Sequence, residues 1–343
     1  MMNEETPREN RMGTEHIPSL LMKMALPMML SMLVQALYNV VDSIFVAKIS
    51  EDALTALSVA FPLQNLMIAF AVGLGVGINS LLSRALGEQD GQKANTAAGN
   101  GLFLELCAAL LFVFIGLVLG PAFVRSQTSS AIVADHGITY VRICIGAGAF
   151  CFIAIFYERM LQATGKTHLA MIGQLVGALI NIVFDPILIF GFGLGVRGAA
   201  IATVLSQAVG AAWIIRFLTG KKTILRLRKD CMRPEKKVIL PVMALGISTF
   251  VMMSTESLLS ISFSSSLARY GGDVAVGAMT VITSASQLCT LPIQGICQGG
   301  QPVMSFNFGA GKKLRVKEAF RFQLTLCGCY TCLFWLLMML APG

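Results

Sequence analysis

Nine long apolar segments constrain the fold of this chain more than any other feature. We place them at residues 20–47, 54–83, 97–123, 131–160, 168–191, 198–219, 237–268, 274–306 and 316–341. About 20 apolar residues are enough for a helix to cross the hydrocarbon core of a bilayer. Only 13% of the residues are charged, whereas a soluble domain carries about 25%. The sequence therefore predicts an all-α polytopic membrane protein.

The basic residues between these segments predict how the helices are oriented. If the N-terminus lies inside, 21 of the 26 lysines and arginines fall at the inner side and five at the outer side. Inner loops of membrane proteins are enriched in lysine and arginine. The split supports the number of segments and a cytoplasmic N-terminal tail over residues 1–16.

The longest polar connection is also the most basic part of the chain. Residues 216–237 hold nine lysines and arginines. We interpret residues 220–236 as a cytoplasmic linker that contacts anionic lipid headgroups, and we expect no binding to nucleic acid.

The last three segments repeat the first three. Leu26–Met29 (LPMM) matches Leu240–Met243 (LPVM), and at the same shift Asp42 falls on Glu256. Further matches link residues 61–64 with 291–294, 86–87 with 308–309 and 119–121 with 340–342. Because six segments separate the copies, both have the same orientation, as in transporters built from two parallel halves.

The repeat predicts two lobes of unequal size. The N-lobe, residues 17–219, would contain six helices, and a partial C-lobe, residues 237–343, would contain three. We expect the chain to be a fragment of a twelve-span protein that stops after the third helix of its second lobe. The alternative is a native nine-span protein.

The first apolar segment carries polar residues on one side. Gln35, Asn39 and Asp42 are spaced by four and three residues, so they share a helix face with Tyr38 beside them. A carboxylate at membrane depth costs about 3 kcal/mol on insertion scales, which makes Asp42 a candidate functional residue. The alternative is that Asp42 lies near the outer interface and caps or snorkels. Pro27 removes a backbone hydrogen bond, so we predict that the helix bends there.

A second group of polar residues lies in segments five and six. Asn181 and Asp185 are four residues apart and share a helix face, and Thr203 and Gln207 have the same spacing. Two carboxyl groups in one cavity repel each other, so we expect Asp42 and Asp185 to share a proton or hold a cation. Oxygen ligands alone suit Na⁺ or H⁺ rather than zinc or copper. Taken singly, Asn181 and Thr203 could also make ordinary interhelical hydrogen bonds.

Other kinds of chemistry have little support in the sequence. The three histidines are scattered, and the nine cysteines fall almost wholly inside apolar segments, where they are expected to pack as small apolar residues. We find no nucleophile–base pair for an intramembrane enzyme and expect no cofactor other than a coupling ion. A structural or receptor role would not explain why Asp42 and Glu256 occupy matching positions in the two copies of the repeat.

The combined pattern resembles one transporter family. It comprises Pro27, Gln35, Tyr38, Asp42-Ser43, Pro62, Gly87, Asn181, Asp185-Pro186, Gly195-Val-Arg-Gly198-Ala-Ala and Thr203. In this pattern the chain resembles the multidrug and toxic compound extrusion (MATE) transporters, and among them MepA-like bacterial members. The resemblance runs through nearly all 343 residues.

The resemblance implies a fold and an activity. Members have two six-helix lobes around a V-shaped cavity and export drugs in exchange for H⁺ or Na⁺. We expect a monomeric efflux antiporter for cationic and amphipathic drugs in the bacterial inner (cytoplasmic) membrane, with its N-terminus in the cytoplasm. The sequence leaves the substrates and the choice between H⁺ and Na⁺ open.

The resemblance also assigns roles to individual residues. The cation-coupling cluster, a candidate Na⁺ site, comprises Asp42, Asn181, Asp185 and Thr203. A supporting polar network comprises Gln35, Tyr38, Asn39 and Gln207. Pro27 matches the proline hinge, and Glu256 matches an acid of the second lobe. The acidic partner expected on span ten is not in this sequence, which puts a second-lobe site in question.

An alternative within transport is a flippase for lipid-linked precursors or polysaccharides from the same superfamily. We expect such a protein to place several arginines inside its cavity. Here most basic residues fall in loops between the apolar segments, which favours drug efflux.

Overall fold

The fold consists of long helices, seen in a computed structural model that describes residues 11–218, 232–270 and 272–340. In chain order the helices are α1 (Arg11–Thr14), α2 (Ile17–Ala47), α3 (Glu51–Gly87), α4 (Gly91–Phe114), α5 (Gly120–Gln127), α6 (Ala131–Gly146), α7 (Ala149–Ala163), α8 (Thr167–Pro186), α9 (Val196–Leu218), α10 (Lys236–Tyr270), α11 (Gly272–Gly309) and α12 (Lys313–Leu340). Two π-helical turns, Ile115–Leu119 and Ile187–Gly191, follow α4 and α8. No strand occurs in these residues, so the predicted all-α class is confirmed.

Polar residues set where several helices begin. The side chains of Ser50, Asp90 and Ser130 accept hydrogen bonds from the backbone N–H three residues later, at the starts of α3, α4 and α6. Such caps satisfy N–H groups that have no partner in the first helical turn. The short connections between the apolar segments therefore fall at capping residues.

The number of membrane-spanning helices differs in part from the nine predicted. In the described residues, seven helices are long and apolar enough to cross a membrane. An eighth span forms if α6 and α7, which meet at an angle of 44°, are counted together. The predicted eighth segment, 274–306, is the helix α11, which is not among these candidates. Most of the linker 220–236 and the first ten residues of the N-terminal tail lie outside the described residues.

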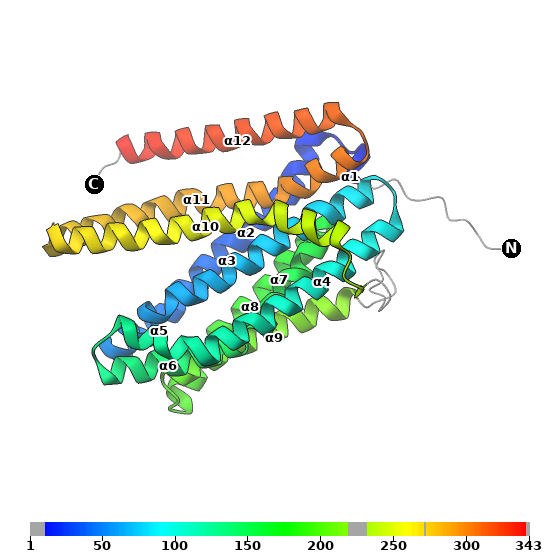
Figure 1. Cartoon of the computed structure of the whole chain (residues 1–343). Helices are drawn as coiled ribbons and strands as arrows, with labels where there is room; N and C mark the ends of the chain where they lie inside the picture. The colour runs from blue at the N-terminus through cyan, green and yellow to red at the C-terminus, as the bar shows by residue number, and fades with distance from the viewer. Residues whose placement is uncertain (1–10, 219–231, 271, 341–343) are drawn as a thin grey trace.

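The helices form a layered arrangement around α2 and α3. In Figure 1 these two helices lie between the group α4–α9 and the group α10–α12. The most extensive helix contacts are those of α10 with α3 and of α11 with α2. If α10 repeats α2 and α11 repeats α3, the two contacts are equivalent. Each one joins the first helix of one copy to the second helix of the other copy. This reciprocal packing agrees with the repeat found in the sequence.

Glycines allow the backbones of the two copies to approach closely. A Cβ on Gly77 of α3 would collide with the carbonyl of Val242 on α10, and one on Gly246 would collide with the carbonyl of Gly73. A Cβ on Gly87 would meet the carbonyl of Phe306, at the C-terminal ends of α3 and α11. Small residues let helix backbones pack at short range in membrane proteins.

Candidate cation site and its cavity

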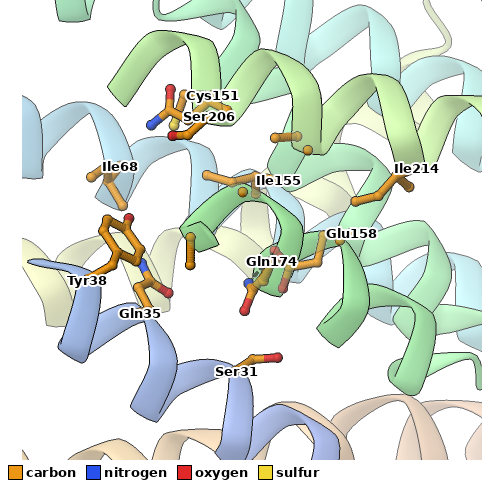
Figure 2. Close-up of a pocket in the computed structure, with 16 residues that line it drawn as sticks. Ser31, Gln35, Tyr38, Ile68, Cys151, Ile155, Glu158, Gln174, Ser206 and Ile214 are labelled. Atoms are coloured by element: carbon orange, nitrogen blue, oxygen red, sulfur yellow. Dashed lines mark hydrogen bonds between the residues drawn. The ribbon is translucent and has the colours of Figure 1, made fainter. Parts of the chain in front are cut away.

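A cavity of about 150 Å³ lies between α2, α3, α7, α8 and α9. Ser31, Gln35 and Tyr38 of α2 form one wall of this cavity, and Glu158 of α7 and Gln174 of α8 lie across from them, as Figure 2 shows. The polar residues of α2 in this wall are spaced by four and three positions, so one helix face supplies them all.

The two acids predicted to form the coupling site lie together. The carboxyl groups of Asp42 and Asp185 are close enough to interact electrostatically, and both also act on the ring of Tyr38, which lines the cavity. Asp185 is fully buried. Neither of its oxygens, nor the buried Oδ1 of Asp42, has a hydrogen-bond partner among the described residues. Buried carboxyl oxygens without donors need a proton or a cation.

Asn181 is brought to the same place by α8. Its side chain is 1% exposed, and both atoms of its amide lack a hydrogen-bond partner among the described residues. It precedes Asp185 by one helical turn, as the sequence predicted. An unpartnered buried amide oxygen one helical turn from a carboxyl group is a suitable ligand for Na⁺.

Thr203 and Gln207 come from α9. The hydroxyl of Thr203 donates to the carbonyl of Ala199 at 3.0 Å, which leaves its oxygen lone pairs available. Gln207 lines the cavity together with Gln35 and Tyr38. The structure therefore gathers three of the four residues predicted as the supporting network.

Asn39 does not join this group. Its side chain is exposed and does not line the cavity. Its backbone carbonyl accepts a hydrogen bond from the hydroxyl of Ser43. Consecutive residues point about 100° apart around a helix, so Tyr38 and Asn39 cannot both face one small cavity. The polar face of α2 contains Ser31, Gln35, Tyr38 and Asp42.

Pro27 and Glu256 lie apart from the cavity. α2 continues through Pro27 as one helix, so the hinge remains a prediction. Glu256 of α10 is exposed and does not line the cavity.

The sequence profile of the family described as MatE matches residues 27–187 and 248–343, which is more than half of the chain. The chain belongs to the MatE family. The match begins at Pro27 and includes Asp42, Asn181, Asp185 and Glu256.

Named relatives agree with this assignment. The chain is 26% identical over 308 residues to the multidrug export protein MepA of Staphylococcus aureus strain MSSA476, and 27% identical over 302 residues to MepA of Staphylococcus haemolyticus strain JCSC1435. Each alignment covers 88% of this chain and 66% of the relative. The chain thus spans slightly less than two thirds of the length of these relatives.

Solved structures of transporters have the same fold. The structure described as an outward-facing conformation of a multidrug resistance MATE family transporter has a TM-score of 0.92 and 25% identity, over 99% of this chain and 76% of that one. A transporter of the MOP superfamily from Pyrococcus furiosus also scores 0.92 at 25% identity, over 98% of this chain and 75% of that chain. The predicted MATE resemblance is therefore confirmed.

This MatE chain also contains buried charged residues that the sequence reasoning missed. Glu105 of α4 is 0% exposed, and Glu158 and Arg159 of α7 are 8% and 4% exposed. Arg159 falls near the end of the predicted segment 131–160, and the structure buries it within α7. The rule that marks Asp42, that acids in apolar segments are functional candidates, also applies to Glu105 and Glu158.

Proposed function

We propose that the protein is a secondary antiporter that exports organic cations in exchange for H⁺ or Na⁺. The observation that carries this proposal is the pairing of Asp42 and Asp185 beside the cavity, with three carboxyl oxygens that lack hydrogen-bond partners in the described residues. A cation bound there would neutralise the pair. Its arrival or release would change the relative stability of the outward- and inward-facing states.

The composition of the cavity wall supports cationic rather than anionic cargo. Glu158 lines the cavity, Tyr38 of the same wall lies beside Asp42 and Asp185, and no arginine or lysine is among the lining residues that the structure describes. A flippase for anionic lipid-linked precursors would need basic residues in this wall to bind phosphate groups. We therefore favour drug efflux over the flippase alternative.

The described functions of the relatives and the conformations of the solved neighbours also support this proposal. The two named relatives are multidrug export proteins, and solved neighbours include a MATE structure in the straight and in the bent conformation. By analogy, we propose alternating access with bending at Pro27, in a monomer of the inner membrane whose N-terminus is cytoplasmic.

The proposal can be tested in membrane vesicles that contain the chain. We expect efflux of a cationic dye when a pH or Na⁺ gradient is imposed, and loss of this efflux in Asp42→Asn. A membrane potential of 100 mV is worth about 2.3 kcal/mol per charge, so the driving force supports accumulation of tens-fold. The matched control is Asp135→Asn, the same change at an exposed acid. Undiminished efflux by Asp42→Asn would remove this residue from the mechanism.

A further inference from the structure

A second group of buried charges lies toward the opposite end of the first lobe from the Asp42–Asp185 pair. Glu158 lies five residues before the end of α7, and α8 begins after a three-residue connection. Asp185 lies at the far end of α8, about 27 Å from its start at a rise of 1.5 Å per residue. Gln174, which bonds to Glu158, is about 10 Å from that start by the same rise.

Glu158 is held by two amide groups. The Nε2 atoms of Gln162 and Gln174 each donate to one of its carboxyl oxygens at 2.8 Å. Gln162 in turn accepts a hydrogen bond from Arg159 at 2.9 Å. The carboxyl group of Glu158 is therefore fixed in position at the cavity wall, where it is 8% exposed.

The charges of this group do not balance when both acids are ionised. Glu105 is fully buried close to Arg159, and neither of its oxygens has a hydrogen-bond partner among the described residues. One guanidinium compensates one carboxylate, and a second buried carboxylate is unfavourable unless it is neutralised. Since Glu158 is the acid that faces the cavity, a cation that arrives through the cavity reaches Glu158 first.

Glu105 and Arg159 are the other charged members of this buried group, and apart from Glu158 the described residues that line the cavity include no acid, lysine or arginine. Tyr38 of α2 and Cys151 of α7 are the remaining titratable groups in the wall. The neighbouring helices contribute neutral polar groups: Ser31 from α2, Asn79 and Ser83 from α3, Gln174 from α8, and Ser206 and Gln207 from α9.

The polar lining of the cavity can hold water. Ser31 is 1% exposed and lines the cavity, yet its hydroxyl lacks a partner among the described residues. The Oε1 atom of Gln174 is also unpartnered. These atoms can hold water between Glu158 and Tyr38.

We propose that Glu158 is a second proton-binding site, which exchanges protons with water in the cavity and connects the Asp42–Asp185 pair to the inner end of the lobe. A hydronium ion in the cavity gives its proton to the carboxylate of Glu158 and becomes water, and release is the reverse step. The direction in which the proton moves rests on the proposed antiport. Proton binding at Glu158 does not.

Proton binding can be measured on the purified full chain in detergent. An infrared titration follows the C=O stretch of protonated carboxylic acids as the pH is changed. We expect Glu158→Gln to remove one titrating carboxyl group, Glu158→Asp to restore it, and the double change Asp42→Asn with Asp185→Asn to leave it in place. A folded Glu158→Gln protein whose titration matches the unmodified chain would overturn the proposal.

A chemical measurement avoids reliance on the variants. Dicyclohexylcarbodiimide reacts with protonated carboxyl groups in apolar surroundings, and peptide mapping identifies the labelled residue. We expect a pH-dependent adduct on Glu158 of the unmodified chain. Labelling of Asp42 or Asp185 with no adduct on Glu158 at any pH would contradict the proposal even if Glu158→Gln failed to fold.

Transport measurements separate this proposal from the proposed function. We expect Glu158→Gln to lower efflux driven by a pH gradient about a hundredfold or more, since positioned proton-transfer groups contribute factors of this order. Exchange of dye for dye without a gradient should persist. Equal loss of gradient-driven efflux and of dye exchange would indicate that Glu158 binds substrate, and it would contradict the proposed proton-binding role. If Asp42→Asn leaves efflux intact, the antiport fails while the infrared result for Glu158 stands.

Discussion

The first and second copies of the internal repeat share a sequence pattern but differ in their surroundings. In the most apolar part of α2, 44% of residues are buried, whereas in α10 the share is 11%. Asp42 and Glu256 hold the same register, yet Asp42 lies beside Asp185 of α8 and Glu256 is exposed. In the described chain, α10 packs against α3, α4 and α11, whereas α2 packs against α8, which carries Asp185. Whether an acid of the repeat is a candidate ion site therefore depends on the helix that packs against it and on the side chains that this helix supplies.

The largest effect that separates the two copies should come from the glycine contacts. Gly77→Ala would place a methyl group against the carbonyl of Val242. Since backbone atoms cannot move aside as a side chain can, we expect a loss of about 3 kcal/mol in the free energy of unfolding, at the upper end for overpacking. The measurement is thermal or denaturant unfolding in detergent.

The matched control for this substitution lies in α12. Nothing lies within 4 Å of a Cβ on Gly328, so Gly328→Ala should be neutral or stabilise by up to about 1 kcal/mol through helix propensity. Similar destabilisation by both changes would mean that the close packing of α3 on α10 is not the cause.

The next effect is a difference in transport between the two acids. We expect Asp42→Asn to abolish gradient-driven dye efflux and Glu256→Gln to reduce it less than threefold, because Asp42 is paired with Asp185 whereas Glu256 is exposed. Both rates are measured in the same vesicles, normalised to the amount of protein. Equal loss in the two variants would show that the copies are functionally equivalent and that the observed pairing does not decide the role.

A third effect concerns the contact that joins the N-terminal helix to the second copy. Asn307 of α11 is fully buried and donates to the carbonyl of Met12 at 2.8 Å, and Arg315 donates to its Oδ1 atom at 2.9 Å. Asn307→Ala removes both of these hydrogen bonds from a buried site, which should lower stability by about 1–3 kcal/mol. A neutral result in thermal unfolding would show that water replaces the amide.

The smallest effect should come from the exposed connection between α3 and α4. A hydrogen bond from Lys93 and a second one from Arg84 hold the pKa of Glu88 below its usual value of 4.5. Because the folded pKa is lowered, any stabilisation is present above the usual pKa and is lost as the pH falls through the folded pKa. The group is exposed, so Glu88→Gln should change stability by less than about 1 kcal/mol at pH 7. A larger change in unfolding would indicate that this connection has a role in packing.

Much of the fold follows from local sequence signals. Apolar runs locate the helices, and Ser50, Asp90 and Ser130 mark three of the starts. The repeat predicts that α10 and α11 resemble α2 and α3, and the reciprocal helix contacts agree with it. α11 falls outside the candidate spans of the described residues, so apolarity alone does not decide every span.

The site was predictable where residues repeat along one helix and not where distant residues meet. The spacing of Asn181 and Asp185 on α8 predicts that they are neighbours. Nothing local distinguishes Tyr38 from Asn39, since only the packing of α2 on α8 decides which one faces the cavity. Glu105 and Arg159 come together through the contact of α4 with α7, which neither segment encodes by itself.

The account depends on Asp42 and Asp185 acting as one cation site, which is tested most directly by counting cations. Proton uptake, measured with a pH-indicator dye, and binding of radioactive Na⁺ are determined on the purified chain and on Asp42→Asn, Asp185→Asn and the double variant. We expect each single change to remove the same bound cation, so that the double variant loses no more than either one. Independent losses that add in the double variant would contradict a shared site.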